Sequence, residues 1–357
     1  MSSLFTPLCT LIQTRFPIIQ APMAGGPTTP ALVASVSNSG ALGSLGAGYM
    51  TPEAIREAIH EIKRRTDRPF GVNLFIPSDA SLAVPDLAPM KQFLSQIHPA
   101  SEAQFGAIEI PSFEDQLAVV LAEEVPVFSF TFGQLGGDVV RELQNRGTAV
   151  VGTATTVEEA FALQASGVDA VVAQGYEAGG HRGTFLHQVE TSLVGTMALI
   201  PQIVNQLHVP VIASGGIMDG RGIAASLMLG AAGVQLGTAF LVAQESGAHP
   251  AYKRAVVESG ASDTVLTNGF SGKVARAIRN HFTEEIREFP GEIPPYPMQN
   301  SLTRPLRNWA AKRSDTDYMS LFAGQGAAMG REIPAAELVH QLVEETKASL
   351  LRGSELL

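Results

Sequence analysis

The chain has 357 residues, of which 45% are hydrophobic and 16% are charged, and its net charge at pH 7 is −10. The acidic balance argues against a protein that binds nucleic acid through a basic surface, and the apolar content argues against a disordered chain. The length is sufficient for one α/β barrel of roughly 250 residues with a smaller appended region.

The single cysteine, Cys9, cannot form an internal disulfide, and one cysteine excludes a cysteine-rich zinc site. The first residues contain no basic segment followed by an apolar run, so we expect no secretory signal and a cytoplasmic protein. The longest uncharged run, Ile223–Gln244, has the length of a membrane span. Gly230, Gly233 and Gly237 interrupt it, which favours a short helix, a turn and a buried strand, and we expect no membrane association.

Eight short apolar runs bounded by turn residues predict buried parallel strands. They are Pro17–Ala21, Ala41–Leu45, Phe70–Phe75, Val125–Phe130, Ala149–Gly152, Ala170–Ala173, Val209–Ala213 and Gly233–Leu236. Most are followed by a helical pattern, and Thr51 and Pro52, for example, supply an N-cap hydroxyl and a proline at the first helical position. Alternating strands and helices predict right-handed βαβ units. Eight units ending near residue 240 predict an α/β fold of the (β/α)8, TIM-like barrel type.

Three segments do not fit a simple βα unit. Residues 76–125 are longer than the crossover between the third and fourth strands needs. Gly247–Arg313, rich in glycine, proline and arginine, predicts a partly helical cap over the barrel mouth. Ala335–Leu351 predicts a helix that packs back on the barrel. We therefore expect a barrel at 1–240, a cap or substrate region at 241–315, and a C-terminal helical segment at 316–357.

The ends of the seventh and eighth predicted strands indicate a phosphate site. Barrel enzymes often bind phosphate between these two loops, and glycine lets backbone N–H groups approach the phosphate oxygens. The residues concerned are Ser214, Gly215, Gly216, Gln235, Leu236, Gly237 and Thr238, the last of which adds a hydroxyl donor. Tight turns alone would also explain the glycines, but eight strands in register favour the phosphate site.

Two carboxamides and a histidine stand at other strand ends. Asn73 and Gln174 lie near the ends of the third and sixth strands. A carboxamide is both donor and acceptor, which suits the edge of a flavin ring, although a buried structural amide would look the same. His181 follows Gly179 and Gly180 in a glycine-rich loop opposite the proposed phosphate site, where an imidazole can act as a base, an acid or a hydrogen-bond donor. No H-E-x-x-H pattern is present, and we predict no metal site.

Taken together, these motifs resemble those of the nitronate monooxygenase family, formerly called 2-nitropropane dioxygenases, and within it the bacterial class I type. The matching motifs are Gln20–Gly26, Gly71–Phe75, Gln174–Gly183, Ser214–Ile217, Gln235–Thr238 and Ala323–Gly326. The resemblance covers most of residues 16–345. It implies an FMN-binding barrel that oxidises alkyl nitronates, such as propionate 3-nitronate, with O2 to an aldehyde or ketone plus nitrite, in a detoxifying role.

The resemblance also implies roles for individual residues. His181 would be catalytic: it would face the substrate nitro group as a hydrogen-bonding or cationic imidazole, and it would serve as a base for neutral nitroalkanes. The implied FMN-binding residues are Ala21, Pro22, Met23, Asn73, Gln174, Gly179, Gly180, Ser214, Gly215, Gly216, Gln235, Leu236, Gly237 and Thr238. The segment around Tyr296–Arg304 of the cap would set the shape of the substrate. The implied partners are a small nitronate and O2, and the oligomeric state is open.

Two other functions fit parts of the sequence. The loop that ends at His181 also resembles that of flavin-dependent enoyl-ACP reductases and NADH:quinone reductases, so an NAD(P)H-dependent FMN reductase is the main alternative. A non-catalytic, phosphate-binding barrel is a second. Gly46–Thr51 lacks the third glycine of a G-x-G-x-x-G motif, and neither a P-loop nor a G-x-S-x-G elbow is present, which argues against a dinucleotide held on a Rossmann unit.

Overall fold

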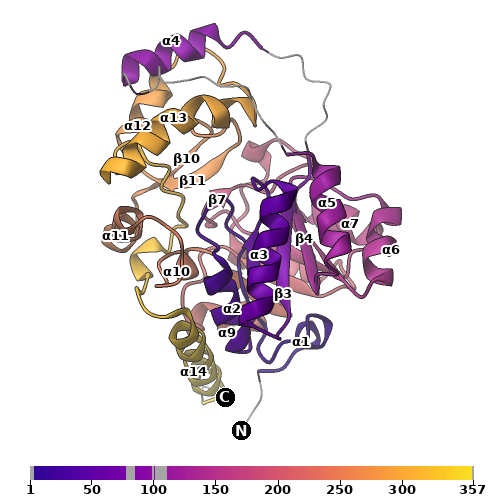
Figure 1. Cartoon of the computed structure of the whole chain (residues 1–357). Coiled ribbons are helices and arrows are strands. Elements are labelled where there is room, and N and C mark those ends of the chain that lie inside the picture. The colour runs from indigo at the N-terminus through magenta and orange to yellow at the C-terminus, as the bar shows by residue number, and fades with distance from the viewer. Residues whose placement is uncertain (1–3, 78–84, 99, 101–110, 356–357) are drawn as a thin grey trace.

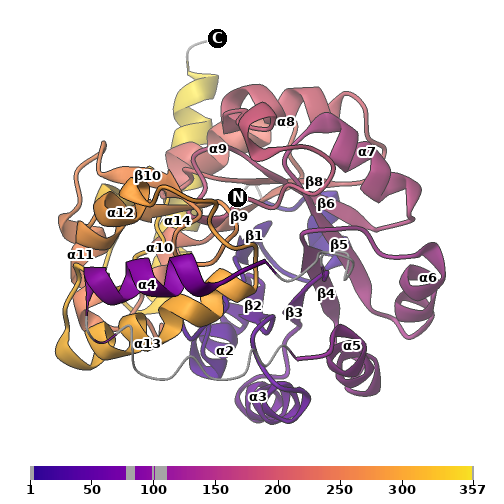
Figure 2. The same cartoon turned by 90° about the horizontal axis from the view of Figure 1, so that it is seen from above.

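The computed structural model describes residues 4–77, 85–98, 100 and 111–355, and its centre is a barrel of eight parallel strands (Figures 1 and 2). The strands are β1 (Ile18–Gln20), β2 (Gly43–Gly46), β3 (Phe70–Phe75), β4 (Val127–Thr131), β5 (Ala149–Ala154), β6 (Ala170–Gln174), β8 (Val211–Ser214) and β9 (Gly233–Leu236). They follow the order β1-β9-β8-β6-β5-β4-β3-β2. Each corresponds to one predicted apolar run, so the predicted α/β barrel is confirmed.

The seam between β1 and β2 is closed partly by a side chain. The two strands meet at an isolated parallel bridge between Ile19 and Leu42. Next to it, the Gln20 Oε1 accepts a hydrogen bond from the Ser44 N–H at 3.0 Å, and the Gln20 Nε2 donates to the Ser44 carbonyl at 3.1 Å. The buried amide of Gln20 therefore takes the place of a backbone pairing that would otherwise leave two polar groups of Ser44 unsatisfied.

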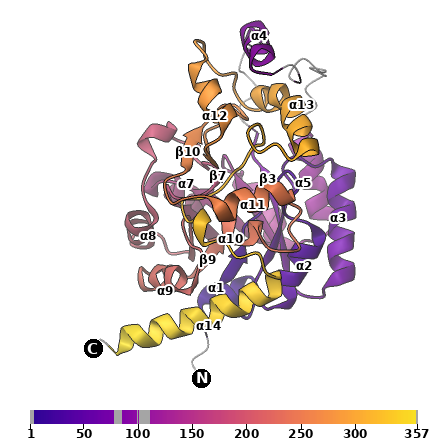
Figure 3. The same cartoon turned by 90° about the vertical axis from the view of Figure 1, so that its left-hand side faces the viewer.

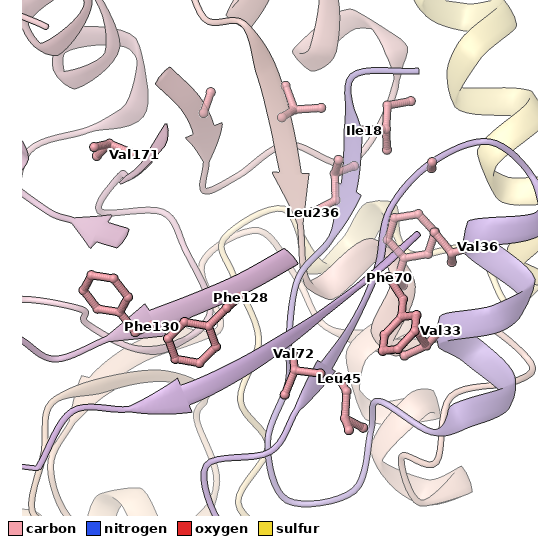
Figure 4. Packing of buried hydrophobic residues seen from close by; sticks show 14 of the residues in the cluster. Ile18, Val33, Val36, Leu45, Phe70, Val72, Phe128, Phe130, Val171 and Leu236 are labelled. Atoms are coloured by element: carbon pink, nitrogen blue, oxygen red, sulfur yellow. The ribbon is translucent and has the colours of Figure 1, made fainter. Parts of the chain in front are cut away.

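Helices surround the barrel and cover its outer face (Figure 2). They are α2 (Pro30–Asn38), α3 (Pro52–Arg65), α5 (Phe113–Ala122), α6 (Gly137–Asn145), α7 (Val157–Ala165), α8 (Thr196–Val204) and α9 (Gly220–Met228). In α3, as predicted, the Thr51 hydroxyl caps the helix by accepting from the Ala54 N–H, and Pro52 stands in the first turn. Outward strand residues and inward helix residues form the main core, in which Val33 and Val36 of α2 lie against Phe70 of β3 (Figure 4).

Along each strand, side chains alternate between this core and the barrel interior. At the amino-terminal ends of the strands, the inward positions are apolar, as at Val127, Val151, Val172 and Ile212. Leu8 of α1 (Pro7–Leu11) packs in the same cluster and closes the lower end of the barrel. The interior is therefore filled from below, and only its carboxyl-terminal end has room for a ligand.

A cap lies over that open end (Figures 1 and 3). Its elements are β7 (Gly180–His181), η2 (Val189–Thr191), α10 (Thr238–Leu241), α11 (Pro250–Glu258), β10 (Thr264–Thr267), β11 (Ala275–Ile278), α12 (His281–Glu285), η3 (Ile286–Glu288), α13 (Met298–Arg313) and η4 (Ala327–Met329). Strands β10, β11 and β7 form an antiparallel sheet, which joins the loop after β6 to the cap.

Two segments outside residues 241–315 contribute to this arrangement. Helix α4 (Ala88–Ile97), from the long connection between β3 and β4, packs its Met90 and Leu94 against Phe282 and Leu302 of the cap. Helix α14 (Ala335–Ser354) packs on α9 and α2 and runs past the edge of the barrel (Figure 3). The predicted boundaries at residues 240 and 315 stay a prediction. No helix among the described residues is long and apolar enough to cross a membrane, and these residues contain no cluster of side chains suited to a metal ion.

The seam generates a stability prediction. Replacing Gln20 by leucine keeps the volume but leaves the Ser44 N–H and carbonyl without their partner, and each unsatisfied buried group costs about 1–3 kcal/mol. We therefore expect Gln20→Leu to lower the free energy of unfolding by about 2–4 kcal/mol in urea denaturation. Gln134→Leu is the control, since the exposed Gln134 makes one hydrogen bond, to the Ala162 carbonyl. Equal, small losses in both variants would contradict this role for Gln20.

Candidate active site

A cavity of about 450 Å³ lies at the carboxyl ends of the barrel strands, beneath the cap. Its floor consists of the same inward-facing positions that are apolar lower in the barrel. At this level Asn73, Ser129, Thr153, Gln174, Ser214 and Gln235 each stand two residues beyond an inward apolar residue or glycine of their strand. Ala21 and, two residues beyond Ser129, Thr131 complete the floor. The change from apolar to polar on one face of the barrel makes this end a binding site.

The structure brings almost all of the predicted site residues together around this cavity. His181, Ala21, Pro22, Met23, Asn73, Gln174, Gly179, Gly180, Ser214, Gly215, Gly216, Gln235, Gly237 and Thr238 line it. Leu236 does not. Its side chain is buried in the main core, where the alternation of β9 places it, and its carbonyl accepts a hydrogen bond from the Ala21 N–H.

Backbone approaches closely to backbone at the predicted phosphate site. Gly215 and Gly216 have φ values of 120° and 70°, which side-chain-bearing residues rarely adopt. A Cβ on Gly179 would lie 2.4 Å from the Gly324 nitrogen, so the segment after β6 and the segment at Gly324 can meet only without one. The Gly324 N–H donates to the Thr238 Oγ1 at 3.0 Å. The hydroxyl hydrogen of Thr238 is therefore left to donate to a ligand.

The three carboxamides on the barrel side of the cavity have different amounts of hydrogen-bonding capacity left. Gln174 is largely committed to its own loop, because its Oε1 accepts from the Gly183 N–H at 2.8 Å and its Nε2 donates to the His181 carbonyl at 3.0 Å. Asn73 donates through Nδ2 to the Ser129 hydroxyl at 2.9 Å. The Gln235 side chain makes no hydrogen bond to any described residue. Gln235 and the Oδ1 of Asn73 are thus the amide groups best able to bind a ligand.

Buried charged groups fix the loop that carries His181. Arg182 is fully buried and donates to the carbonyls of Gly175, at 2.7 Å, and Ser192, at 3.0 Å. Burial lowers the pKa of Arg182 to about 10, so it stays positively charged at neutral pH. Glu177, which the sequence could not assign, accepts from the backbone N–H and hydroxyl of Thr196 and so anchors the loop to α8.

His181 lies in an aromatic environment at the edge of the cavity. Its ring is 5.8 Å from that of Phe132, in an edge-on arrangement, and 5.3 Å from that of Phe322. Burial lowers the pKa of His181 to about 3, and the positive charges of Lys273 and Arg307 act in the same direction. The imidazole is therefore neutral at pH 7. The sequence analysis allowed either a hydrogen-bonding or a cationic imidazole at His181. The lowered pKa fits the neutral, hydrogen-bonding form and not the cationic one.

The cap contributes positive charge to the cavity. Arg304 and Arg307 of α13 line it, and among the described residues no aspartate or glutamate does. Arg307 is held by the Asn300 carbonyl and Oδ1, both at 2.8 Å. Burial lowers its pKa to about 10, so it also remains charged. Lys273 stands 4.5 Å from the centre of the Phe132 ring. The cavity therefore favours an anionic ligand.

Several of these residues were not predicted individually. The sequence pointed to the segment around Tyr296–Arg304 as a whole, and both Tyr296 of that segment, 6.4 Å from the His181 ring, and Arg304 lie at the site. No sequence motif marks Phe132, Arg307 or Ser271, the last of which contacts the His181 ring. Phe132 follows a strand that ends in no recognisable motif. Its φ of 78° is rare for a residue other than glycine, so this backbone conformation could not be inferred from the sequence.

Comparison with known proteins agrees with this geometry. The family model described as nitronate monooxygenase matches residues 6–345. The chain belongs to the nitronate monooxygenase family. A probable nitronate monooxygenase of Bacillus subtilis is 47% identical over 333 residues, which are 92% of this chain and 95% of that protein. The family consists of flavin enzymes, and the chain is an oxidoreductase with a TIM-barrel-like fold.

Solved structures give the same assignment. A nitroalkane oxidase from Streptomyces ansochromogenes aligns with a TM-score of 0.89 and 41% identity, covering 97% of this chain and 99% of its own. FabK from Thermotoga maritima aligns less well, with a TM-score of 0.78 and 32% identity over 99% of both chains. The reductase alternative derived from the sequence is therefore not favoured.

The electrostatics around His181 give a second prediction. A neighbouring positive charge disfavours the protonated imidazole, so Lys273→Met should raise the pKa of His181 from its low value. The pKa is measured by NMR titration, and the His181 signal is the one missing in His181→Asn. Lys312→Met, at an exposed position in the last turn of α13, is the control and should leave the pKa unchanged.

The same lowered pKa affects stability with a defined sign. Between pH 6.5 and about 3 the unfolded chain protonates this histidine and the folded protein does not, so its contribution to stability decreases as the pH falls through that window. A wild-type His181 pKa near 6.5 would contradict the neutral imidazole.

Proposed function

We propose that this enzyme binds FMN in the cavity and oxidises alkyl nitronates, such as propionate 3-nitronate, with O2 to an aldehyde or ketone plus nitrite. The observation that carries the proposal is the composition of the cavity wall. A glycine-rich cradle and free amide groups stand on the barrel side, whereas a neutral histidine and two arginines stand on the cap side. The part of the wall that the structure describes contains no carboxylate. Membership in the nitronate monooxygenase family supports it.

The barrel side fits a flavin that carries one phosphate. In the proposal, Gly215, Gly216 and Gly237 offer backbone N–H groups to the phosphate, and Thr238 adds its free hydroxyl hydrogen. Gln235 and Asn73 hydrogen-bond the ring system. The cavity volume of about 450 Å³ falls within the range of small-molecule sites. One phosphate cradle and no fingerprint for an ADP group favour FMN over FAD.

The cap side fits an anionic substrate. A nitronate carries a negative charge, and Arg304 and Arg307 bring positive charge into a cavity in which no described residue adds a carboxylate. Such a field raises the local concentration of the anion and speeds its association. A nitronate with a second negative group, such as the carboxylate of propionate 3-nitronate, would be attracted to the cavity through both of its negative groups.

The chemistry divides between the cofactor and the protein. The isoalloxazine ring supplies the redox chemistry, because it can accept electrons from a nitronate and pass them to O2. A nitronate has already lost its α-proton, so the protein has to orient and stabilise the anion rather than supply a strong base. His181 does this with a neutral N–H, and the aromatic rings around it exclude water, which strengthens the hydrogen bond. Its lowered pKa makes it a weak base, so we propose that nitronates are preferred over neutral nitroalkanes.

The proposed reaction is tested by nitrite release. Purified enzyme with propionate 3-nitronate should release nitrite only when O2 is present, and flavin released by heating should be identified chromatographically as FMN. The parent nitroalkane should react much more slowly at the same pH. Recovery of FAD would show that the cap holds a nucleotide site, and an absence of nitrite would overturn the proposed reaction.

The phosphate cradle is tested at Gly237, where a side chain fits. A Cβ there would meet only the Ala21 Cβ, at 3.7 Å, an ordinary contact. Gly237→Asp should fold but lose most of its flavin, because a carboxylate beside the phosphate is repelled by it. Gly237→Ala, which adds the Cβ without the charge, should retain flavin. If both variants retain full flavin content by absorbance, the phosphate does not lie at Gly237.

The role of His181 is tested by the ratio of two activities. Asparagine keeps a hydrogen-bond donor but cannot take up a proton at neutral pH. His181→Asn should retain measurable turnover of nitronates, whereas the residual turnover of a neutral nitroalkane should fall further, by up to the 10²–10⁴-fold that a positioned base contributes. Flavin content should stay near that of the wild type. Small and equal losses on both substrates would show that His181 serves only to shape its loop.

A further inference from the structure

Ser271 is in direct contact with His181 although it belongs to a different part of the chain. Its side chain is 2% exposed, and its Oγ lies 2.8 Å from the Nε2 of His181. Ser271 precedes β11, and β11 pairs with β7 so that Ala275 stands opposite His181. The register of this small sheet therefore sets the serine against the imidazole.

The hydrogen bonds of Ser271 indicate where its single hydroxyl hydrogen lies. Its Oγ lies 2.8 Å from the His181 Nε2, where either atom can donate, and 3.1 Å from the Lys273 carbonyl, to which the hydroxyl can only donate. It also accepts from the Lys273 N–H at 3.3 Å. A hydroxyl that donates is usually within about 3.0 Å of its acceptor, so the short contact is the better match. Because the same hydrogen cannot also point at the Lys273 carbonyl, a hydroxyl directed at the imidazole makes Nε2 the acceptor of the shorter bond.

This assignment fixes the tautomer of the histidine. A neutral imidazole has one N–H and one acceptor nitrogen. If Nε2 accepts from Ser271, the N–H of His181 is at Nδ1. Nδ1 makes no hydrogen bond to a protein group among the described residues, and the side chain lines the cavity. An N–H left without a protein acceptor in a water-poor site needs an acceptor from a ligand.

We propose that Ser271 is a positioning residue, whose hydroxyl donates to the Nε2 of His181 and so holds the imidazole in the tautomer that offers its Nδ1–H to a nitronate oxygen. Both nitronate oxygens are acceptors, so the opposite tautomer would turn a lone pair toward the anion. The identity of the ligand rests on the proposed function. The tautomer is a property of the protein itself and can be observed without turnover.

The tautomer is measured by long-range 1H–15N NMR on the flavin-loaded full chain labelled at histidine, with His181→Asn to assign the signals. We expect a protonated Nδ1 and an unprotonated Nε2 in the wild type. In Ser271→Ala the donor to Nε2 is gone, and the proton should move to Nε2, the tautomer that free imidazole side chains favour. Ser271→Thr keeps the hydroxyl and should keep the wild-type tautomer. Ser320→Ala is the matched control, because Ser320 lines the same cavity but does not bond His181.

Kinetics provide the second readout. Loss of one hydrogen bond to a charged ligand should raise KM for the nitronate by roughly 10- to 100-fold in Ser271→Ala, with a smaller change in kcat, and Ser271→Thr should restore most of it. A wild-type His181 protonated at Nε2, or a tautomer unchanged in Ser271→Ala, would overturn the role of Ser271. The expected tautomers without any nitrite from the wild type would instead overturn the proposed function and leave the positioning role standing.

Discussion

The site depends on the alternation of side chains along parallel strands that close into a barrel. Because successive residues point to opposite faces, a strand such as Val171–Gln174 sends one set of side chains to the helices and the other to the interior. In the interior, the inward residue is apolar at Val172 and polar at Gln174. Neighbouring strands repeat the change at the same height. The barrel is thus a packed core at one end and a polar pocket at the other.

The cap adds the electrostatic character of this pocket. The pairing of β7 with β11 carries Ser271 and Lys273 to His181, and α13 brings Arg307. This arrangement partly buries the imidazole and keeps it neutral. Burying charge is costly unless the charged groups find partners, and around the loop after β6 backbone groups supply most of them, although the buried Nε of Arg182 has none among the described residues. The carboxylate of Glu159 accepts from the N–H groups of Phe185 and Leu186, while Arg182 and Arg276 are bound to loop carbonyls.

Much of the barrel side could be predicted from the sequence, because its signals are local. Apolar runs ending in glycine or a carboxamide mark buried strands, and the end of a strand in a parallel barrel is always at the same face. Thr238 and Asn73 were identified in this way. The same reasoning did not separate Leu236, whose side chain belongs to the outward set of β9, from the residues that line the cavity. It also could not show that Gln174 uses most of its hydrogen-bonding capacity within its own loop.

The cap side could not be predicted in the same detail, because its residues act through contacts that are distant in sequence. Ser271 follows His181 by 90 positions and meets it only through strand pairing. Nothing in the helical pattern around Arg307 indicates a role in the site. The residue lines the cavity only because α13 lies over the barrel mouth. The choice between a cationic and a neutral imidazole depends on burial and on two positive neighbours, neither of which a motif records.

The central claim is that this cavity makes a bound flavin react with nitronates rather than with a nicotinamide. The most direct measurement mixes the flavin-loaded enzyme anaerobically with propionate 3-nitronate or with NADH and follows bleaching of the flavin absorbance. The account predicts rapid bleaching by the nitronate and little by NADH. Rapid bleaching by NADH, with none by the nitronate, would contradict it.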